Sequence, residues 1–379
     1  MPSCHQLYSS YLAFSYEPLD REAREFRLLR LFPSTDFEAE IYCELFHSSL
    51  NDHPPYEALS YVWGDPNATV AIRLHEVDHH VTVNLALALR YLRLREETRI
   101  IWADAVCINQ KDDIEKTYQV RLMRDIFLGV EQVAVWLGED AKGKAKETLD
   151  LFDGTGTDSM YSRWLYDKIT FWDECNSVFY RPWWTRAWTL QEVIHDRPVQ
   201  AYIGFHQTDL DELCTKFLSY LKYTYILKED SQPKQPTPAA APQPSDTYIN
   251  SMVASHNLLN IAFLIRAERK DQRNTPNRLL PLVHALLRTR NQQCTDARDK
   301  VFALLGMPYH PGLDAKGLIN YRSSKRNIYT AVMQLLLQCD APSMLHIQSP
   351  QRSCTYLCPF SLNFGVEAMA LLSQSKERS

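Results

Sequence analysis

The stretch RPWWTRAWTLQEV, residues 181–193, is the one around which the rest of the chain is organised. Its composition predicts a helix, because Pro182 suits a first helical position, where its missing N–H costs nothing. At 3.6 residues per turn, Trp184, Trp188 and Glu192 follow one another at intervals of four and share one helical face. A carboxylate in line with two indoles is costly to ionise, which marks Glu192 as a candidate for chemistry.

The same stretch also has a purely structural interpretation. It would then be a core helix whose last turn reaches solvent, with Glu192 paired to Arg186 or Arg197. Arg181 lies close to the stripe that carries Glu192 and could contact whatever binds there. The stretch alone leaves both interpretations open.

Composition bounds the class of protein. The 379 residues suffice for two or three domains of roughly 150 residues each, and 45% hydrophobic and 23% charged content are ordinary for a soluble globular chain. The net charge is −5 and the sequence contains no block of basic residues, so nucleic acid is not an expected partner. No apolar run approaches the ~18 residues that span a bilayer, and the N-terminus does not resemble a secretory signal. We expect a cytoplasmic protein.

The cysteines and histidines give little indication of metal binding or redox chemistry. Nine scattered cysteines without a CxxC pair favour reduced thiols. The group at 75–80, HEVDHH, could in principle ligate zinc, but it falls at a predicted hairpin turn, where exposed polar residues are ordinary. We therefore expect no metal and no required cofactor.

Short apolar strands alternate with helical patterns before residue 205. This alternation favours an α/β fold with a mainly parallel sheet. The expected strands are 26–32, 39–46, 56–64, 70–74, 80–83, 99–106, 132–137 and 199–203. The expected helices of this part are one capped by Asn84 and those at 114–127, 145–152 and 161–180.

The domain organisation follows from composition. All eight tryptophans lie between Trp63 and Trp188, which indicates one compact aromatic-rich domain, and residues 229–246 hold five of the twenty prolines. The expected parts are an extension 1–24, the domain 25–205, a helical connection 206–228, a disordered Pro-rich linker 229–246, a mostly helical region 247–340 and a weakly patterned tail 341–379.

Four sequence blocks, in this order, resemble the heterokaryon-incompatibility (HET) domain of filamentous fungi. They are YEALSYVWG (56–64), IWADAVCINQ (101–110), QVRLMRDIF with QVAVWLGE (119–139) and RPWWTRAWTLQEV (181–193), within a motif core of about 38–204. A later segment, CTDARDKVFALLGM (294–307), resembles one often found downstream in such proteins.

The resemblance implies a fold and a chemistry. The HET domain looks like a distant relative of the Toll/interleukin-1 receptor (TIR) fold, so the strands at 56–64, 99–106 and 132–137 would be its first three. The 181–193 helix would match the TIR helix that carries a tryptophan and, in enzymatic members, the glutamate that cleaves NAD+. Trp188 and Glu192 are the matching positions. Such a carboxylate would stabilise the oxocarbenium-like ribose as nicotinamide leaves.

Other polar residues are candidates for substrate contact. They are Ser60, Tyr61, Asp104, Asn109, Gln110 and Arg181, together with Trp188. Asp104 follows the second strand, where α/β folds place ligand groups. Each also has a structural alternative: Asp104 could cap the following helix, Ser60 could pack tightly, and Asn109 could turn the chain. NAD+ would be a substrate, not a cofactor.

The family resemblance also implies a biological role. It points to self/non-self recognition and programmed cell death after hyphal fusion, a fungal form of innate immunity. The expected partners are further copies of the chain or another HET or NLR-type protein. The alternatives are a non-enzymatic signalling and assembly module and an inactive regulatory paralogue.

Overall fold

The computed structural model describes residues 14–151, 177–219, 282–306 and 315–339, together with the single positions 174, 175, 265, 269, 270 and 274. The predicted helix at 161–180 lies mostly outside these residues. The Pro-rich linker, most of residues 247–281 and the tail 341–379 lie outside them as well.

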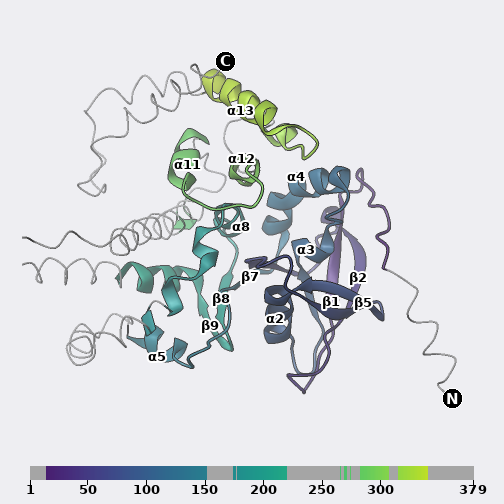
Figure 1. Cartoon of the computed structure of the whole chain (residues 1–379), viewed down its shortest axis with the longest axis vertical. Helices are drawn as coiled ribbons and strands as arrows, with labels where there is room; N and C mark the ends of the chain where they lie inside the picture. Colours follow the sequence, from purple (N-terminus) through teal and green to yellow (C-terminus); the bar gives the residue numbers. More distant parts are fainter. Residues whose placement is uncertain are drawn as a thin grey trace, which may run out of the picture.

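Nine strands form one twisted sheet at the centre of the molecule (Figure 1). The strands are β1 Glu25–Leu31, β2 Tyr42–Ser49, β3 Glu57–Tyr61, β4 Thr69–Leu74, β5 Val77–Thr82, β6 Arg99–Trp102, β7 Gln132–Trp136, β8 Val199–Ile203 and β9 His206–Asp209. Their order across the sheet is β5-β4-β2-β1-β6-β3-β7-β8-β9. The sheet extends to Asp209, past the domain boundary predicted at residue 205.

The prediction of a mainly parallel sheet is wrong, because the sheet is mixed. The pairs β1–β2, β1–β6, β4–β5 and β8–β9 are antiparallel, and the pairs β2–β4, β3–β6, β3–β7 and β7–β8 are parallel. The reason lies in the connections. Two-residue turns join β4 to β5 and β8 to β9, and such short links permit only antiparallel pairing, whereas parallel pairing needs a long crossover.

The central part of the sheet is nevertheless parallel throughout. Its order is β6-β3-β7-β8, so the first of these strands along the chain lies between the second and the third. This 2-1-3-4 order is that of doubly wound α/β folds, in which ligands bind at the carboxyl ends of the strands. The ends of β3 and β6 therefore lie at one edge of the sheet.

Helices flank the sheet and connect its strands (Figure 1). The α-helices are α2 Val83–Leu92, α3 Asp104–Cys107, α4 Asp113–Gly129, α5 Ala145–Asp150, α8 Thr189–Val193, α11 Leu282–Thr289, α12 Asp299–Leu305 and α13 Lys325–Cys339. Short 3-10 helices are η1 Leu50–Asp52, η2 Pro182–Thr185 and η3 Ala315–Leu318. A further helical stretch covers residues 210–219.

Two local predictions need correction. The strand predicted for 99–106 ends at Trp102, and α3 begins at Asp104. The helix α2 is capped by Thr82, whose side chain accepts from the N–H of Leu85, and not by Asn84. The reason is that the Asn84 amide has tertiary partners: it donates to the carbonyl of Val62 and accepts from the indole N–H of Trp136.

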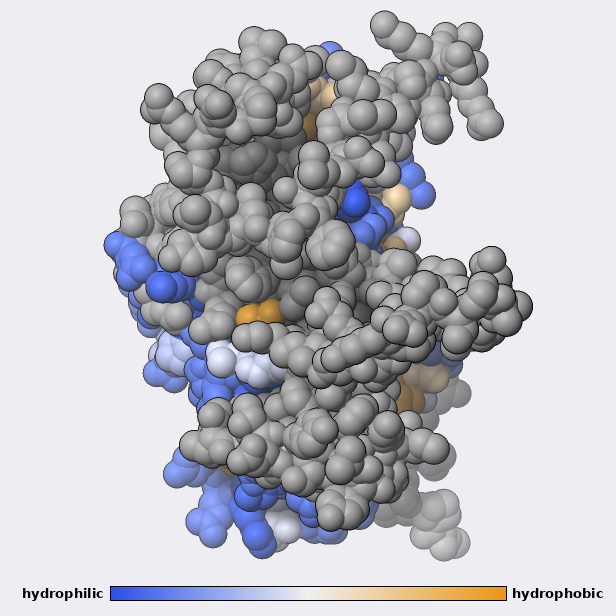
Figure 2. All heavy atoms as spheres, turned by 90° about the vertical axis from the view of Figure 1, so that its left-hand side faces the viewer, coloured by the Kyte–Doolittle hydropathy of each residue, from blue (hydrophilic) through white to orange (hydrophobic). Residues whose placement is uncertain are grey.

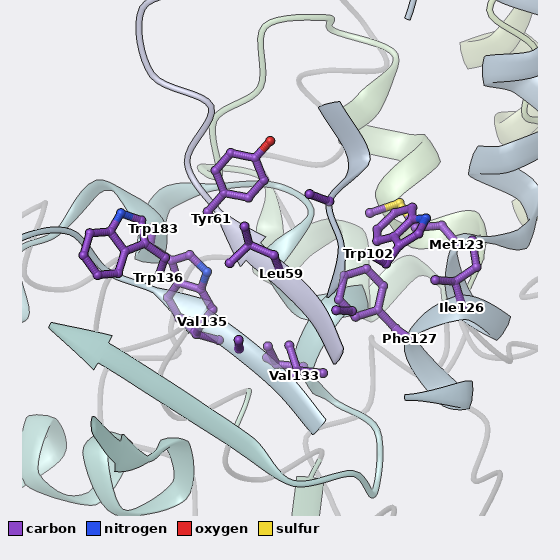
Figure 3. Close-up of a cluster of buried hydrophobic side chains, with 14 of the residues drawn as sticks. Leu59, Tyr61, Trp102, Met123, Ile126, Phe127, Val133, Val135, Trp136 and Trp183 are labelled. Atoms are coloured by element: carbon purple, nitrogen blue, oxygen red, sulfur yellow. The ribbon is translucent and has the colours of Figure 1, made fainter. Parts of the chain in front are cut away.

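The core lies between the central strands and α4. Leu59 of β3 lies between the valines of β7 on one side and Trp102 on the other, and Trp102 packs edge-on against Phe127 with ring centroids 5.5 Å apart (Figure 3). Burial of such side chains stabilises the fold by roughly 1.5–3 kcal/mol each. It fixes the position of β3, which carries Ser60 and Tyr61, relative to β6 and β7.

The C-terminal helices dock onto this domain. Helices α11, α12 and α13 lie beside α4 and α8 (Figure 1), and Arg121 of α4 donates to the carbonyl of Ile319 at 3.0 Å. The N–H of Tyr321 in turn donates to Thr117 of α4 at 3.0 Å. On one side of the molecule, the described surface is largely hydrophilic with small hydrophobic patches (Figure 2).

Candidate functional site

The segment 181–193 is not the continuous helix predicted from its sequence. The 3-10 helix η2 ends at Thr185, Arg186 is extended with φ −74° and ψ 141°, and α8 begins only at Thr189. The cause is a backbone bridge to Gln293, which donates to the carbonyl of Thr185 at 2.5 Å and accepts from Ala187 at 2.9 Å. Backbone groups used in this bridge are not available for helical hydrogen bonds.

Glu192 lies at the centre of a buried polar cluster. Its side chain accepts from the hydroxyl of Ser60 at the end of β3 and from both terminal nitrogens of Arg186, at 2.8 and 3.0 Å. Ser60 itself accepts from the indole N–H of Trp183 at 2.8 Å. Only 1% of the Glu192 surface is exposed. The carboxylate is therefore held by a bidentate ion pair and a hydroxyl, away from water.

This geometry confirms the partner named in the structural interpretation. Arg186 is the cation that pairs with Glu192, while Arg197 donates to the carbonyl of Leu128 at 2.8 Å. Burial alone would lower the pKa of Arg186, but the charge and hydrogen bonds of Glu192, together with electrostatic interactions with Asp104 and Tyr61, raise it. The guanidinium and the carboxylate thus form a bidentate ion pair in a buried setting.

Asp104 extends the cluster toward the surface. It stands at the start of α3, and its carboxylate accepts from the backbone N–H of Ala105 at 2.8 Å and from the indole N–H of Trp63 at 2.9 and 3.1 Å. Burial raises the pKa of Asp104, the positive charge of Arg186 opposes this, and the negative charge of Glu192 adds to it. Three charged side chains thus interact at the carboxyl ends of β3 and β6.

Tyr61 lies beside this cluster, at the last residue of β3. Its hydroxyl is buried and forms no hydrogen bond of ordinary geometry with the described residues, yet it lies close enough to Asp104 to feel its charge. Burial, and then Asp104, raise the pKa of Tyr61 well above its usual value. The phenol is therefore a neutral group next to a carboxylate. Figure 3 shows the hydroxyl pointing away from the valines of β7.

The structure brings Ser60, Tyr61, Asp104 and Glu192 together, but not the other candidates. Trp188 lies against Asp299 of α12, close enough for its indole to hydrogen-bond that carboxylate. Arg181 donates to the carbonyls of Leu137 and Glu139, both at 3.0 Å.

Asn109 and Gln110 support the loop after α3. The side chain of Asn109 accepts from the N–H of Lys111 at 3.2 Å, as a turn residue does. Gln110 donates from its side chain to the carbonyl of Asp104 at 2.8 Å and so braces the start of α3.

Trp63 and Trp183 also belong to this site, although the sequence pattern did not single them out. Trp183 hydrogen-bonds Ser60, and Trp63 hydrogen-bonds Asp104. Both lie within the motif blocks, and Trp63 follows β3 by two residues, which is where α/β folds place functional side chains. That position is the signal that could have identified Trp63.

Metal ligation and membrane insertion find no support in the described residues. In that part of the chain, no three His, Cys, Asp or Glu side chains are grouped so that they could hold a metal ion. Over the same residues, no helix is long and apolar enough to cross a membrane.

The structure thus defines a class of protein. It is an α/β protein with a buried cluster of serine, carboxylate and arginine side chains at the carboxyl ends of the parallel strands β3 and β6. Residues 56–192 match the family described as heterokaryon incompatibility protein (HET). This segment of the chain, which holds Ser60, Asp104 and Glu192, is therefore similar to the HET domain of fungi.

A curated relative is similar over a longer stretch. Over 226 aligned residues the chain is 33% identical to heterokaryon incompatibility protein 6, OR allele, of Neurospora crassa. The alignment covers 47% of this chain and 33% of the relative, so the chain spans about a third of that protein's length. No solved structure matches the chain significantly.

Proposed function

We propose that the chain acts in heterokaryon incompatibility, in self/non-self recognition and cell-death signalling, through hydrolysis of NAD+ at the buried cluster. The parallel strand order β6-β3-β7-β8 supports the relation to TIR domains inferred from the motifs. In this proposal the chain acts in the cytoplasm and is activated when copies of it, or another HET or NLR-type protein, assemble.

The observation that carries the proposal is the convergence of Ser60, Asp104 and Glu192 at the carboxyl ends of neighbouring parallel strands. In the reaction, the bond between ribose C1′ and the ring nitrogen breaks and its electron pair goes to nicotinamide. Positive charge then develops on the ribose, and an ionised carboxylate beside it lowers the barrier. Water adds to C1′ and gives up a proton, so the products are ADP-ribose and nicotinamide.

Arg186 plays a defined part in this proposal. It holds the Glu192 carboxylate in place, and its own side chain is 15% exposed, so it is the more accessible partner of the pair. A substrate reaches the carboxylate when the guanidinium turns away. The structure then corresponds to the resting form of the enzyme.

A second candidate function rests on a different feature of the same pair. Both oxygens of Glu192 are occupied and almost no surface of the residue is exposed, which is also what a purely structural ion pair would show. The chain would then be a non-enzymatic assembly module. NAD+ turnover separates the two functions.

The test measures nicotinamide release from NAD+ by the purified full-length chain at high concentration. We expect Glu192→Gln to lower the rate by about 100-fold or more, because the developing ribose charge loses its carboxylate. Glu57→Gln is a matched control, because Glu57 is also paired with an arginine, Arg99, but near the opposite ends of the same strands.

The control separates catalysis from folding. Both variants lose a charged partner of a mostly buried arginine, so both lose stability, but only Glu192→Gln removes the proposed catalytic group. If the parent chain releases no nicotinamide even when assembled at high concentration, the glycohydrolase proposal fails and the assembly module is favoured.

A further inference from the structure

Trp63 is a large aromatic side chain that remains 40% exposed beside the buried cluster. Its single polar atom, the indole nitrogen, already donates to both oxygens of Asp104, at 2.9 and 3.1 Å. The surface that it offers to solvent is therefore carbon and π-system. An exposed tryptophan held edge-on by a carboxylate presents a ring that is electron-rich at its face.

The backbone that carries Trp63 is anchored from both sides. The Asn84 amide donates to the carbonyl of Val62 and accepts from the indole of buried Trp136 at 3.1 Å. On the other side, Gly64 turns the chain with φ +83°, a conformation that favours glycine, and its Cα faces Asn84. The indole is thus placed by the core, although it lies at the surface.

The net charge of the cluster beside Trp63 favours binding of a cation. Asp104, Glu192 and Arg186 interact with one another and together carry a formal charge of −1. Exposure rises along the cluster, from 2% for the Glu192 side chain through 15% for Arg186 to 40% for Trp63. At the exposed end of the cluster a tryptophan ring thus lies beside a carboxylate, and such a pair of groups recognises cationic aromatic or quaternary nitrogen ligands.

We infer that Trp63 and Asp104 form an entrance subsite for the positively charged pyridinium ring of the substrate. The inference rests on the proposed function for its substrate, since the nicotinamide ring of NAD+ is such a cation. When the glycosidic bond breaks, the ring becomes neutral and loses its attraction to both groups. The subsite therefore distinguishes substrate from product by charge.

The test uses two small probes and the full-length chain. 1-Methylnicotinamide carries the pyridinium charge but no ribose bond to cleave, and nicotinamide is its neutral counterpart. Binding is followed by NMR titration, with 5-fluorotryptophan labels and Trp63→Phe used to identify the Trp63 signal. We expect the parent to bind the cation at least about tenfold more tightly than nicotinamide, and Trp63→Ala to weaken binding of the cation about tenfold.

Further variants separate the two contributions and control for exposure. Asp104→Asn should remove most of the preference for the charged probe, while Trp63→Phe should keep part of the affinity, because a phenyl ring is a weaker cation acceptor. Tyr42→Ala removes another exposed aromatic residue, on β2, and should leave the Kd of both probes unchanged.

The outcomes bear separately on the two proposals. If Trp63→Ala binds 1-methylnicotinamide as tightly as the parent does, the subsite is overturned, even where the parent hydrolyses NAD+. If the parent shows no hydrolysis but its binding of the cation depends on Trp63 and Asp104, the glycohydrolase proposal fails and the cation subsite stands. Equal binding of the two probes, or binding of neither, also overturns the inference.

Discussion

At the scale of single residues, the central question is what Glu192 pairs with. Sequence spacing places it on a tryptophan-lined face, which suggests a carboxylate held among indoles. In the structure its hydrogen-bond partners are a guanidinium and a hydroxyl, and the indole of Trp183 donates to that hydroxyl and not to the carboxylate. The same burial that makes an isolated charge unfavourable makes this pair strongly interdependent.

The ion pair leads to a prediction about stability. Arg186→Met leaves Glu192 buried without its cation, so we expect the free energy of unfolding to fall by about 3–5 kcal/mol. The measurement is the urea midpoint of the full-length chain. The double variant Arg186→Met/Glu192→Met should recover much of the loss, because no charge is then left unpaired. A single variant within about 1 kcal/mol of the parent would contradict the pairing.

At the scale of elements, residues 181–193 illustrate how a neighbouring segment overrides local helical pattern. The local pattern favours a helix, yet the bridge to Gln293 extends the chain at Arg186. The Gln292 side chain is buried there and donates to the carbonyls of Trp184 and Arg186, at 2.8 and 3.3 Å. These bonds satisfy backbone groups that a continuous helix would have paired internally.

A prediction follows for this pair of glutamines. Gln292→Ala should lower the free energy of unfolding by about 1–3 kcal/mol, because two buried carbonyls lose their donor. Gln293→Ala is the matched control, because its exposed side chain can be removed while its backbone bridge stays intact, and its effect should be within about 0.5 kcal/mol. Chemical denaturation of the full-length variants measures both. Equal effects would show that the side chain of Gln292 has no special role.

At the scale of the whole molecule, the C-terminal helices belong to the same folded unit as the segment that carries Glu192. The loop between α11 and α12 contributes Gln292 and Gln293 to the Arg186 segment, and α12 contributes Asp299 to Trp188. The 3-10 helix η3 and the residues after it bind α4. A fragment that ends near residue 210 would lose these contacts. Activity measurements therefore need the full-length chain.

Stability of the whole molecule should also depend on pH through His195. Burial, with a smaller contribution from Arg124, lowers the pKa of His195 from 6.5 to about 3, so the folded protein holds the ring neutral. Below pH 6.5 the unfolded chain takes up a proton that the folded chain does not bind, and stability falls. Between pH 6.5 and 5 the loss from this residue is about 2 kcal/mol.

The measurement for this prediction is the urea midpoint as a function of pH. His195→Gln should flatten the acid side of the curve, since the amide does not titrate. His80→Gln is the control, because His80 is exposed, and it should leave the slope unchanged. An unchanged acid slope in His195→Gln would contradict a buried neutral histidine.

Local pattern predicted most strands and helices of the described part, because alternation and periodicity report which side of an element faces the core. The hairpin of β4 and β5 is confirmed, with His75 and Glu76 both at positive φ in its turn. The motif blocks nominated eight residues, of which the structure brings Ser60, Tyr61, Asp104 and Glu192 together and leaves Trp188, Asn109, Gln110 and Arg181 outside the cluster. Local pattern and motif alike depend on a residue and its near neighbours.

Long-range contacts decided the rest. Besides the hairpins, the mixed sheet contains the antiparallel pair of β1 with β6, which lies some seventy residues further along the chain. The break at Arg186 arises from Gln293, and the partner of Asp104 is Trp63. The members of each pair are much further apart in the sequence than the two to four residues over which strand and helix periodicity acts. Only the folded chain brings them to hydrogen-bonding distance, because each such contact depends on how the whole core packs.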